Sequence, residues 1–145
     1  MFSYSFGAYM EEPMLHVLIV DDEPTYRLVL TQTLKTYKYT TEACETGDAA
    51  IDLLKKNKYD VVLLDYKMPG TSGLNVLQWM YGMKIETPVI IITGHGSEEI
   101  ALEAWKWGAK DYFVKGKSDM SQLPALVLRV YKQVISERQH RSERD

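Results

Sequence analysis

Charged side chains stand at the ends of three short apolar runs in this 145-residue chain. The run Leu15–Val20 is followed by Asp21 and Asp22. The run VVLL ends at Asp65, and the run YFV ends at Lys115. Because the carboxyl ends of neighbouring parallel strands meet at one edge of a sheet, these side chains are expected to converge. The sequence therefore predicts an acidic pocket that contains one lysine.

The three carboxylates of this pocket need a counter-charge. Two unit charges about 4 Å apart repel by roughly 4 kcal/mol at an effective dielectric near 20. A hard divalent cation meets this need, and Mg²⁺ combines one or two carboxylates with water and phosphate oxygens. The sequence has neither the histidine cluster nor the thiolate set that favours zinc. Mg²⁺ is therefore the expected cofactor.

Asp65 is the candidate nucleophile for phosphoryl transfer. It is followed by YKMPGTSG, a loop rich in turn residues that would leave its side chain exposed. A carboxylate beside Mg²⁺ and a lysine can attack a phosphoryl group to form an aspartyl phosphate. Such transfers require mainly positioning and charge neutralisation, to which Lys115 and the hydroxyl of Thr93 can contribute.

Short apolar runs alternate with longer amphipathic segments, which is the pattern of a parallel sheet covered by helices on both faces. The expected strands are Leu15–Val20, Tyr39–Ala43, Asp60–Asp65, Pro88–Thr93 and Asp111–Lys115. The second run is the most polar, which suits an edge strand. Right-handed crossovers and a reversal of winding beside the first strand predict an α/β fold, with a doubly wound five-stranded sheet in the order 2-1-3-4-5.

Composition narrows the classes of function. The 17 basic and 20 acidic residues give a net charge of −3, without the basic excess that a nucleic-acid binder needs. The first residues have neither the basic start nor the apolar core of a signal peptide or membrane anchor. The single cysteine, Cys44, suits a reducing compartment. We expect a cytoplasmic protein that binds neither nucleic acid nor membrane directly.

A chain of this length is expected to hold one domain. We place that domain at residues 15–136, after a loosely ordered N-terminal extension at 1–14. Its last helix carries apolar residues at three/four spacing from Leu123 to Ile135. Residues 137–145 are polar and are expected to form the end of that helix or a linker.

Four motifs, LIVDDE, LLDYKMPGTSG, IIITGHG and DYFVKG, occur in the order and spacing of one family. The chain resembles the receiver domain of two-component response regulators from about Leu15 to Ile135. The resemblance implies a flavodoxin-like fold and a switch that takes a phosphoryl group from the phosphohistidine of a kinase. It implies no conventional enzyme, only Mg²⁺-dependent self-phosphorylation from a phosphodonor and slow autodephosphorylation.

The resemblance implies a role for each residue of the pocket. Asp65 matches the phosphoacceptor, and Asp21 and Asp22 match the acids that hold Mg²⁺ together with Asp65. The backbone carbonyl of Lys67 matches the remaining protein ligand of the metal. Lys67 and His95 also occupy variable positions at the pocket mouth, where they are expected to tune the lifetime of the phosphorylated state.

Thr93 and Lys115 match the hydroxyl and the lysine that contact the phosphoryl group. Thr93 and Tyr112 match the two switch positions that move after phosphorylation. The family usually has a proline after the lysine, often with a cis bond, whereas this chain has Gly116. The loop is therefore either trans and shifted or strained.

Simpler interpretations exist for several of these residues. Asp22 or Glu23 can cap the helix that Pro24 begins. Thr93 can be an ordinary β-branched strand residue, and Tyr112 an ordinary core aromatic. Beside the complete set of motifs, the functional interpretation is favoured.

The resemblance also implies partners. A histidine kinase or phosphotransfer protein would supply the phosphoryl group. A second copy or an output domain would bind the face made by the helix that follows Ser97, the strand Asp111–Lys115 and the last helix. The chain is expected to be part of a larger multidomain regulator or hybrid kinase.

Two rival functions share part of this pattern. The first is a receiver-like interaction module that is not phosphorylated, and the intact acids and lysine speak against it. The second is a phosphatase of the haloacid dehalogenase type, which needs an acid two residues after its nucleophile. Lys67 stands at that position, so this function is excluded.

Overall fold

The computed structural model describes residues 13–94 and 97–144. Its strands are β1 (His16–Val20), β2 (Thr40–Cys44), β3 (Val61–Asp65), β4 (Val89–Thr93) and β5 (Asp111–Val114). Its helices are α2 (Pro24–Thr36), α3 (Gly47–Lys56), α4 (Gly73–Gly82), α5 (Glu98–Lys106) and α6 (Leu123–Arg144), with a 3-10 turn, η1 (Met120–Gln122), before α6. Every strand begins and ends within one residue of its predicted bounds.

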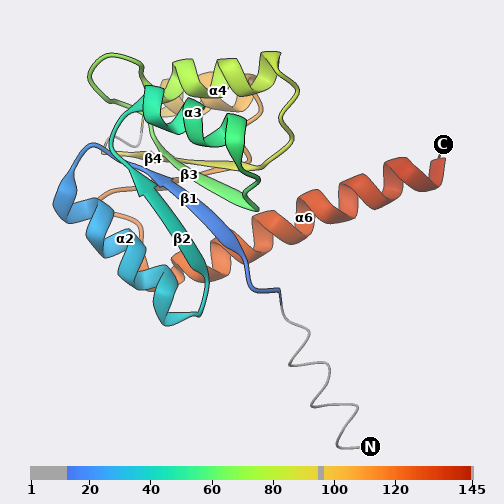
Figure 1. Ribbon diagram of the computed structural model, residues 1–145, viewed down its shortest axis with the longest axis horizontal. Helices are drawn as coiled ribbons and strands as arrows, with labels where there is room; N and C mark the ends of the chain where they lie inside the picture. The colour runs from blue at the N-terminus through green and yellow to red at the C-terminus, as the bar shows by residue number, and fades with distance from the viewer. Residues whose placement is uncertain (1–12, 95–96, 145) are drawn as a thin grey trace, which may run out of the picture.

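The five strands within the described residues form one parallel sheet in the order β2-β1-β3-β4-β5, which confirms the predicted fold. Figure 1 shows α3 and α4 on one face of this sheet and α2 and α6 on the other. Successive strand residues point to opposite faces. Thus Leu64 and Ile91 join the apolar cluster under α3, α4 and α5, whereas Leu63 and Ile92 join the cluster with α2 and α6.

The strand register brings the candidate residues to one edge of the sheet. The pairing of β1 with β3 sets Asp21 level with Asp65. Strand β4 ends at Thr93, whose register partner Val114 directly precedes Lys115. The carboxyl ends of β1, β3, β4 and β5 therefore carry all four side chains, at the edge where open α/β sheets bind ligands.

The loop between β3 and α4 packs closely under Asp65. A Cβ added at Gly73, the first residue of α4, would lie 2.0 Å from the carbonyl oxygen of Asp65. A Cβ at Gly47 would lie 2.4 Å from the carbonyl oxygen of Thr71 in the same loop. Ser72 caps α4 in a capping box. The absence of side chains at Gly47 and Gly73 lets the loop after Asp65 pack closely, and the Ser72 cap fixes where α4 begins.

Helix α6 extends well past the sheet (Figure 1). Its far half contacts the loop between α4 and β4 through two arginines. Arg138 Nη2 donates a hydrogen bond to the carbonyl oxygen of Glu86 at 2.9 Å, and Arg141 Nη2 lies 3.3 Å from the Glu86 carboxylate. The polar end predicted after Ile135 is therefore helical as far as Arg144. Neither α6 nor any other described helix is long and apolar enough to cross a membrane.

The close packing at Gly73 makes a first prediction. Gly73→Ala should lower the free energy of unfolding by about 1–3 kcal/mol, because the new methyl group displaces the backbone of Asp65. Gly82→Ala is the matched control, since a Cβ there meets nothing within 4 Å and alanine favours a helix. Urea unfolding of both variants measures the difference. Equal stability of the two variants would contradict the proposed role of Gly73.

Candidate functional site

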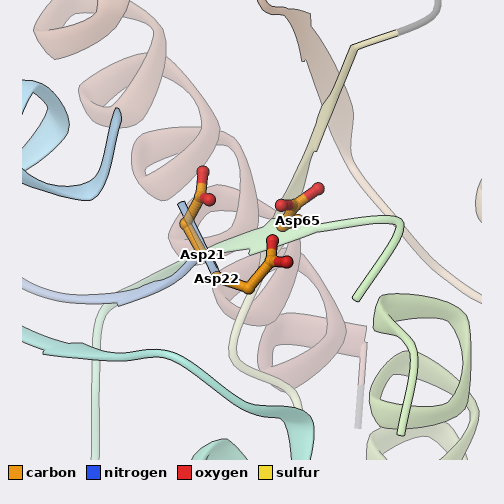
Figure 2. A group of neighbouring side chains, drawn as sticks. All are labelled: Asp21, Asp22 and Asp65. Carbon is orange, nitrogen blue, oxygen red and sulfur yellow. The ribbon is translucent and has the colours of Figure 1, made fainter. Parts of the chain in front are cut away.

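Three aspartates form the centre of the candidate site. Asp21 follows β1, Asp65 ends β3, and both are buried, with 0% and 4% of their surface exposed, so the exposure predicted for Asp65 from the loop after it is wrong. Asp22 is partly buried. Each offers one carboxylate oxygen, and these oxygens all lie within 4.8 Å of one another. Figure 2 shows the three side chains gathered where β1 and β3 end.

The start of α2 fixes Asp21 in this group. The Oδ1 atom of Asp21 accepts a hydrogen bond from the backbone N–H of Glu23 at 2.8 Å. The guanidinium of Arg27 donates to the carbonyl oxygen of Asp21 at 2.6 Å. Glu23 is the N-cap residue of α2, but its side chain makes no capping hydrogen bond. Capping therefore does not account for the Glu23 side chain, which contacts Lys115 instead.

Lys115 lies among the carboxylates. Its Nζ atom is 2.5 Å from Glu23, 3.0 Å from Asp21 and 3.3 Å from Asp65, and its side chain is only 12% exposed. Its backbone N–H donates to the carbonyl oxygen of Thr93 at 2.7 Å, which ties the residue to the end of β4. One ammonium group thus faces three carboxylates.

The peptide bond between Lys115 and Gly116 is trans, which is one of the two forms expected for this loop. All peptide bonds of the described residues are trans, and Gly116 has a φ of 79°. Proline, whose ring fixes φ near −65°, cannot adopt this backbone, so glycine suits the position. The backbone N–H groups of Lys117 and Ser118 both donate to the carbonyl oxygen of Val114 and close the turn. This turn directs Lys115 into the pocket without a proline.

The crowded charges shift the acidities of the site. Burial raises the pKa of Asp65 to about 7, and the neighbouring Asp21 carboxylate adds to this effect while Lys115 opposes it. Burial lowers the pKa of Lys115, but the carboxylates of Glu23, Asp21 and Asp65 outweigh it and raise the pKa above its usual value. The lysine is therefore charged at neutral pH, and Asp65 loses its proton at a higher pH than an ordinary aspartate does.

A cation fits this donor set. The Oδ2 atom of Asp21 is fully buried, and Lys115 Nζ lies 3.0 Å away from it. One ammonium shared by several carboxylates leaves net negative charge in the pocket, which a divalent cation would compensate. Three carboxylates of this spacing are the ligands that hard divalent cations prefer.

The other predicted residues lie around this centre or outside the described chain. Thr93 is buried at the end of β4 and Lys67 is exposed in the loop after β3. Tyr112 is 46% exposed, so it is not a core aromatic. His95 lies outside the described residues.

Two residues of the site were not predicted from sequence. Glu23 makes an ion pair with Lys115, and the ring of Tyr26 lies under the same ammonium, 4.6 Å from Nζ to the ring centroid. Glu23 belongs to the acidic run DDE, so its charge was a visible signal. Tyr26 occupies the first turn of a helix, and its place in the sequence gives no signal of a contact with Lys115.

Comparisons with known proteins agree with this geometry. The family model described as the response regulator receiver domain matches residues 17–128. The chain is similar to the response regulator protein PilR of Pseudomonas aeruginosa, with 38% identity over 110 residues, 76% of this chain and 24% of PilR. It is also similar to the transcriptional regulatory protein ResD of Bacillus subtilis, with 37% identity over 99 residues, 68% of this chain and 41% of ResD. The chain spans less than half the length of either relative.

Solved structures show the same similarity. The receiver domain of the Francisella response regulator 1452 aligns with a TM-score of 0.77 and 29% identity, over 82% of this chain and 98% of that one. Full-length FixJ from B. japonicum aligns with a TM-score of 0.76 and 28% identity, over 83% of this chain and 59% of that one.

The raised pKa of Asp65 makes a second prediction. Between pH 3.8 and about 7 the folded state binds more protons than the unfolded state, so stability from this group is lost as pH rises toward 7. Without divalent cations, Asp65→Asn should therefore be more stable than the wild type by about 1–3 kcal/mol at pH 8, and by less at pH 5. Urea unfolding in a chelator measures this.

The control for this experiment is Asp52→Asn, which removes one exposed carboxylate from α3. It lowers the net negative charge by the same amount as Asp65→Asn does, but outside the pocket. A gain of equal size in both variants would assign the effect to net charge instead of to the buried carboxylates.

Proposed function

We propose a function from one premise: this chain belongs to the family of response regulator receiver domains. The proposed function is a signalling switch in which Asp65 accepts a phosphoryl group from the phosphohistidine of a kinase or phosphotransfer protein and later loses it to water. The observation that supports it most directly is the position of Lys115 Nζ, 3.3 Å from the carboxylate of Asp65 at the carboxyl edge of the sheet.

In the proposed transfer, a carboxylate oxygen of Asp65 attacks the phosphorus atom. A new P–O bond forms as the P–N bond to the donor imidazole breaks, and the electron pair of that bond leaves with the imidazole. The ammonium group of Lys115 pairs with the oxygens of the phosphoryl group, and the Thr93 hydroxyl donates to one of them. Hydrolysis then breaks the P–O bond and returns Asp65 to a carboxylate.

We propose that Asp21, Asp22, Asp65 and the backbone carbonyl of Lys67 would hold Mg²⁺ in this site. When bound, the metal neutralises the phosphoryl oxygens and compensates the repulsion among the carboxylates. The support is the group of three closely spaced carboxylates, whose negative charge exceeds what the single ammonium of Lys115 neutralises.

The proposed output is a change in the face formed by α5, β5 and α6. Phosphorylation would draw Thr93 and Tyr112 inward and so change this face. Three large apolar side chains are exposed on or beside it, with Leu102 and Trp105 each 66% exposed and Tyr112 46% exposed. Aromatic and apolar side chains of this kind are frequent in protein interfaces. A second copy or an output domain is the proposed partner.

We further propose that residues 15–136 form the receiver domain, with residues 137–145 leading into the rest of a larger cytoplasmic regulator. Support comes from the relatives, which are longer proteins. The N-terminal extension, residues 1–14, lies almost wholly outside the described chain. A receiver-like module without phosphorylation is the alternative function, and the intact acid and lysine set argues against it.

Incubation with Mg²⁺ and acetyl phosphate tests the proposed function. The wild type should gain the mass of one phosphoryl group, in an adduct that survives acid and is lost in base. Asp65→Asn should gain none, because its amide is a poor nucleophile. Intact-mass spectrometry measures both, and chelation of Mg²⁺ should suppress the adduct. A wild type that stays unmodified, or a mutant modified equally, would contradict the assignment.

The lifetime of the adduct tests Lys67 and His95. Lys67→Ala and His95→Ala should each change the dephosphorylation rate, because side chains at the pocket mouth obstruct or orient the attacking water. The rate is measured from loss of the adduct after the phosphodonor is removed. Lys58→Ala, at an exposed lysine before β3, is the control and should leave the rate unchanged. Unchanged rates in both test variants would remove this role.

A further inference from the structure

Among the described residues, the ammonium of Lys115 contacts one group that is not a carboxylate, the ring of Tyr26. Its Nζ atom lies 4.6 Å from the centroid of the Tyr26 ring, within the distance at which an ammonium is attracted to the electrons of an aromatic face. We propose that Tyr26 is a positioning residue for phosphoryl transfer, whose ring holds the ammonium of Lys115 in place while the carboxylates change partners. This inference rests on the proposed function and names a further residue of the same site.

The carboxylate partners of Lys115 cannot hold it throughout the reaction. Asp21 and Asp65 are the proposed metal ligands, and Asp65 also becomes the phosphorylated group. The third carboxylate, on Glu23, has a side chain that is 62% exposed. Ion pairs with exposed groups contribute little, because solvent screens them and a long side chain must be ordered. The Tyr26 ring is the contact that neither metal nor phosphoryl group competes for.

Tyr26 itself is well held. It lies in the first turn of α2, two residues after Pro24, and its ring packs against the apolar cluster shared by α2, β5 and α6. The turn after β5 holds the other side of the contact, because the backbone of Lys115 is bound to Thr93. Two fixed elements thus place ring and ammonium together.

The ring, and not the hydroxyl, carries this role. The Tyr26 hydroxyl oxygen is buried and has no hydrogen-bond partner within the described part of the chain. Burial also raises the pKa of Tyr26, so its hydroxyl stays neutral. Removing a buried hydroxyl that has no partner is close to neutral or stabilising. Phenylalanine should therefore replace tyrosine here, whereas leucine should not.

The test compares Tyr26→Leu with Tyr26→Phe, and uses Tyr37→Leu as a matched control. Tyr37 is an exposed tyrosine at the C-terminal end of the same helix. At saturating Mg²⁺, Tyr26→Leu should form the acetyl phosphate adduct about five- to tenfold more slowly than the wild type. Tyr26→Phe and Tyr37→Leu should stay within about twofold of it.

A second readout requires neither metal nor phosphorylation. Protons over an aromatic face are shifted upfield by the ring current, so the ε-methylene protons of Lys115 should be shifted in the NMR spectrum of the metal-free protein. The shift should persist in Tyr26→Phe and disappear in Tyr26→Leu, while amide shifts far from α2 stay unchanged and report an intact fold.

The outcomes separate this inference from the proposed function. If the wild type forms no adduct, the proposed function is contradicted. The NMR chemical shifts of the Lys115 ε-methylene protons then test by themselves whether the ring holds the ammonium. A normal rate in Tyr26→Leu overturns the inference while the function stands. An equal loss of rate in Tyr26→Phe also overturns it, because the hydroxyl would then carry the role.

Discussion

The repulsion among buried carboxylates is the constraint on which the rest of this structure depends. Asp21 and Asp65 are taken almost completely out of water at neighbouring strand ends, with Asp22 beside them. Burying three neighbouring carboxylates in their charged form costs free energy unless positive charge lies nearby. Lys115 supplies one charge from the end of β5, and the donor set leaves room for a cation to supply more. The parallel sheet, the α2 terminus and the turn at Gly116 all serve to keep these charges within reach of one another.

The convergence of Asp21, Asp65 and Lys115 could be predicted because it follows from two simple periodicities. Continuous apolar runs mark buried parallel strands, and parallel strands place their carboxyl ends at one edge. The contacts of Lys115 with Glu23 and Tyr26 could not be predicted in the same way. They join side chains 92 and 89 positions apart in the sequence, and no local pattern encodes which way a long side chain turns.

The close approach of Gly73 to Asp65 was also invisible in the sequence. A glycine after a turn-rich loop is ordinary, and only the packing of α4 against the end of β3 shows that this one has no room for a side chain. The simple interpretation of Tyr112 as a core residue is also wrong. Tyr112 is 46% exposed, although Phe113 and Val114 on the same edge strand are buried, so the strand assignment alone does not predict its burial.

Helix α6 is held at both ends, by the core at its first half and by Glu86 at its far half. Its 22 residues make a rod about 33 Å long at roughly 1.5 Å per residue. A turn of about 10° at its base would move the far end by about 6 Å. Arg138 and Arg141 bind the loop between α4 and β4 near the tip of this rod, so they oppose such a turn. A shift of that loop would be passed directly to the last turns of α6.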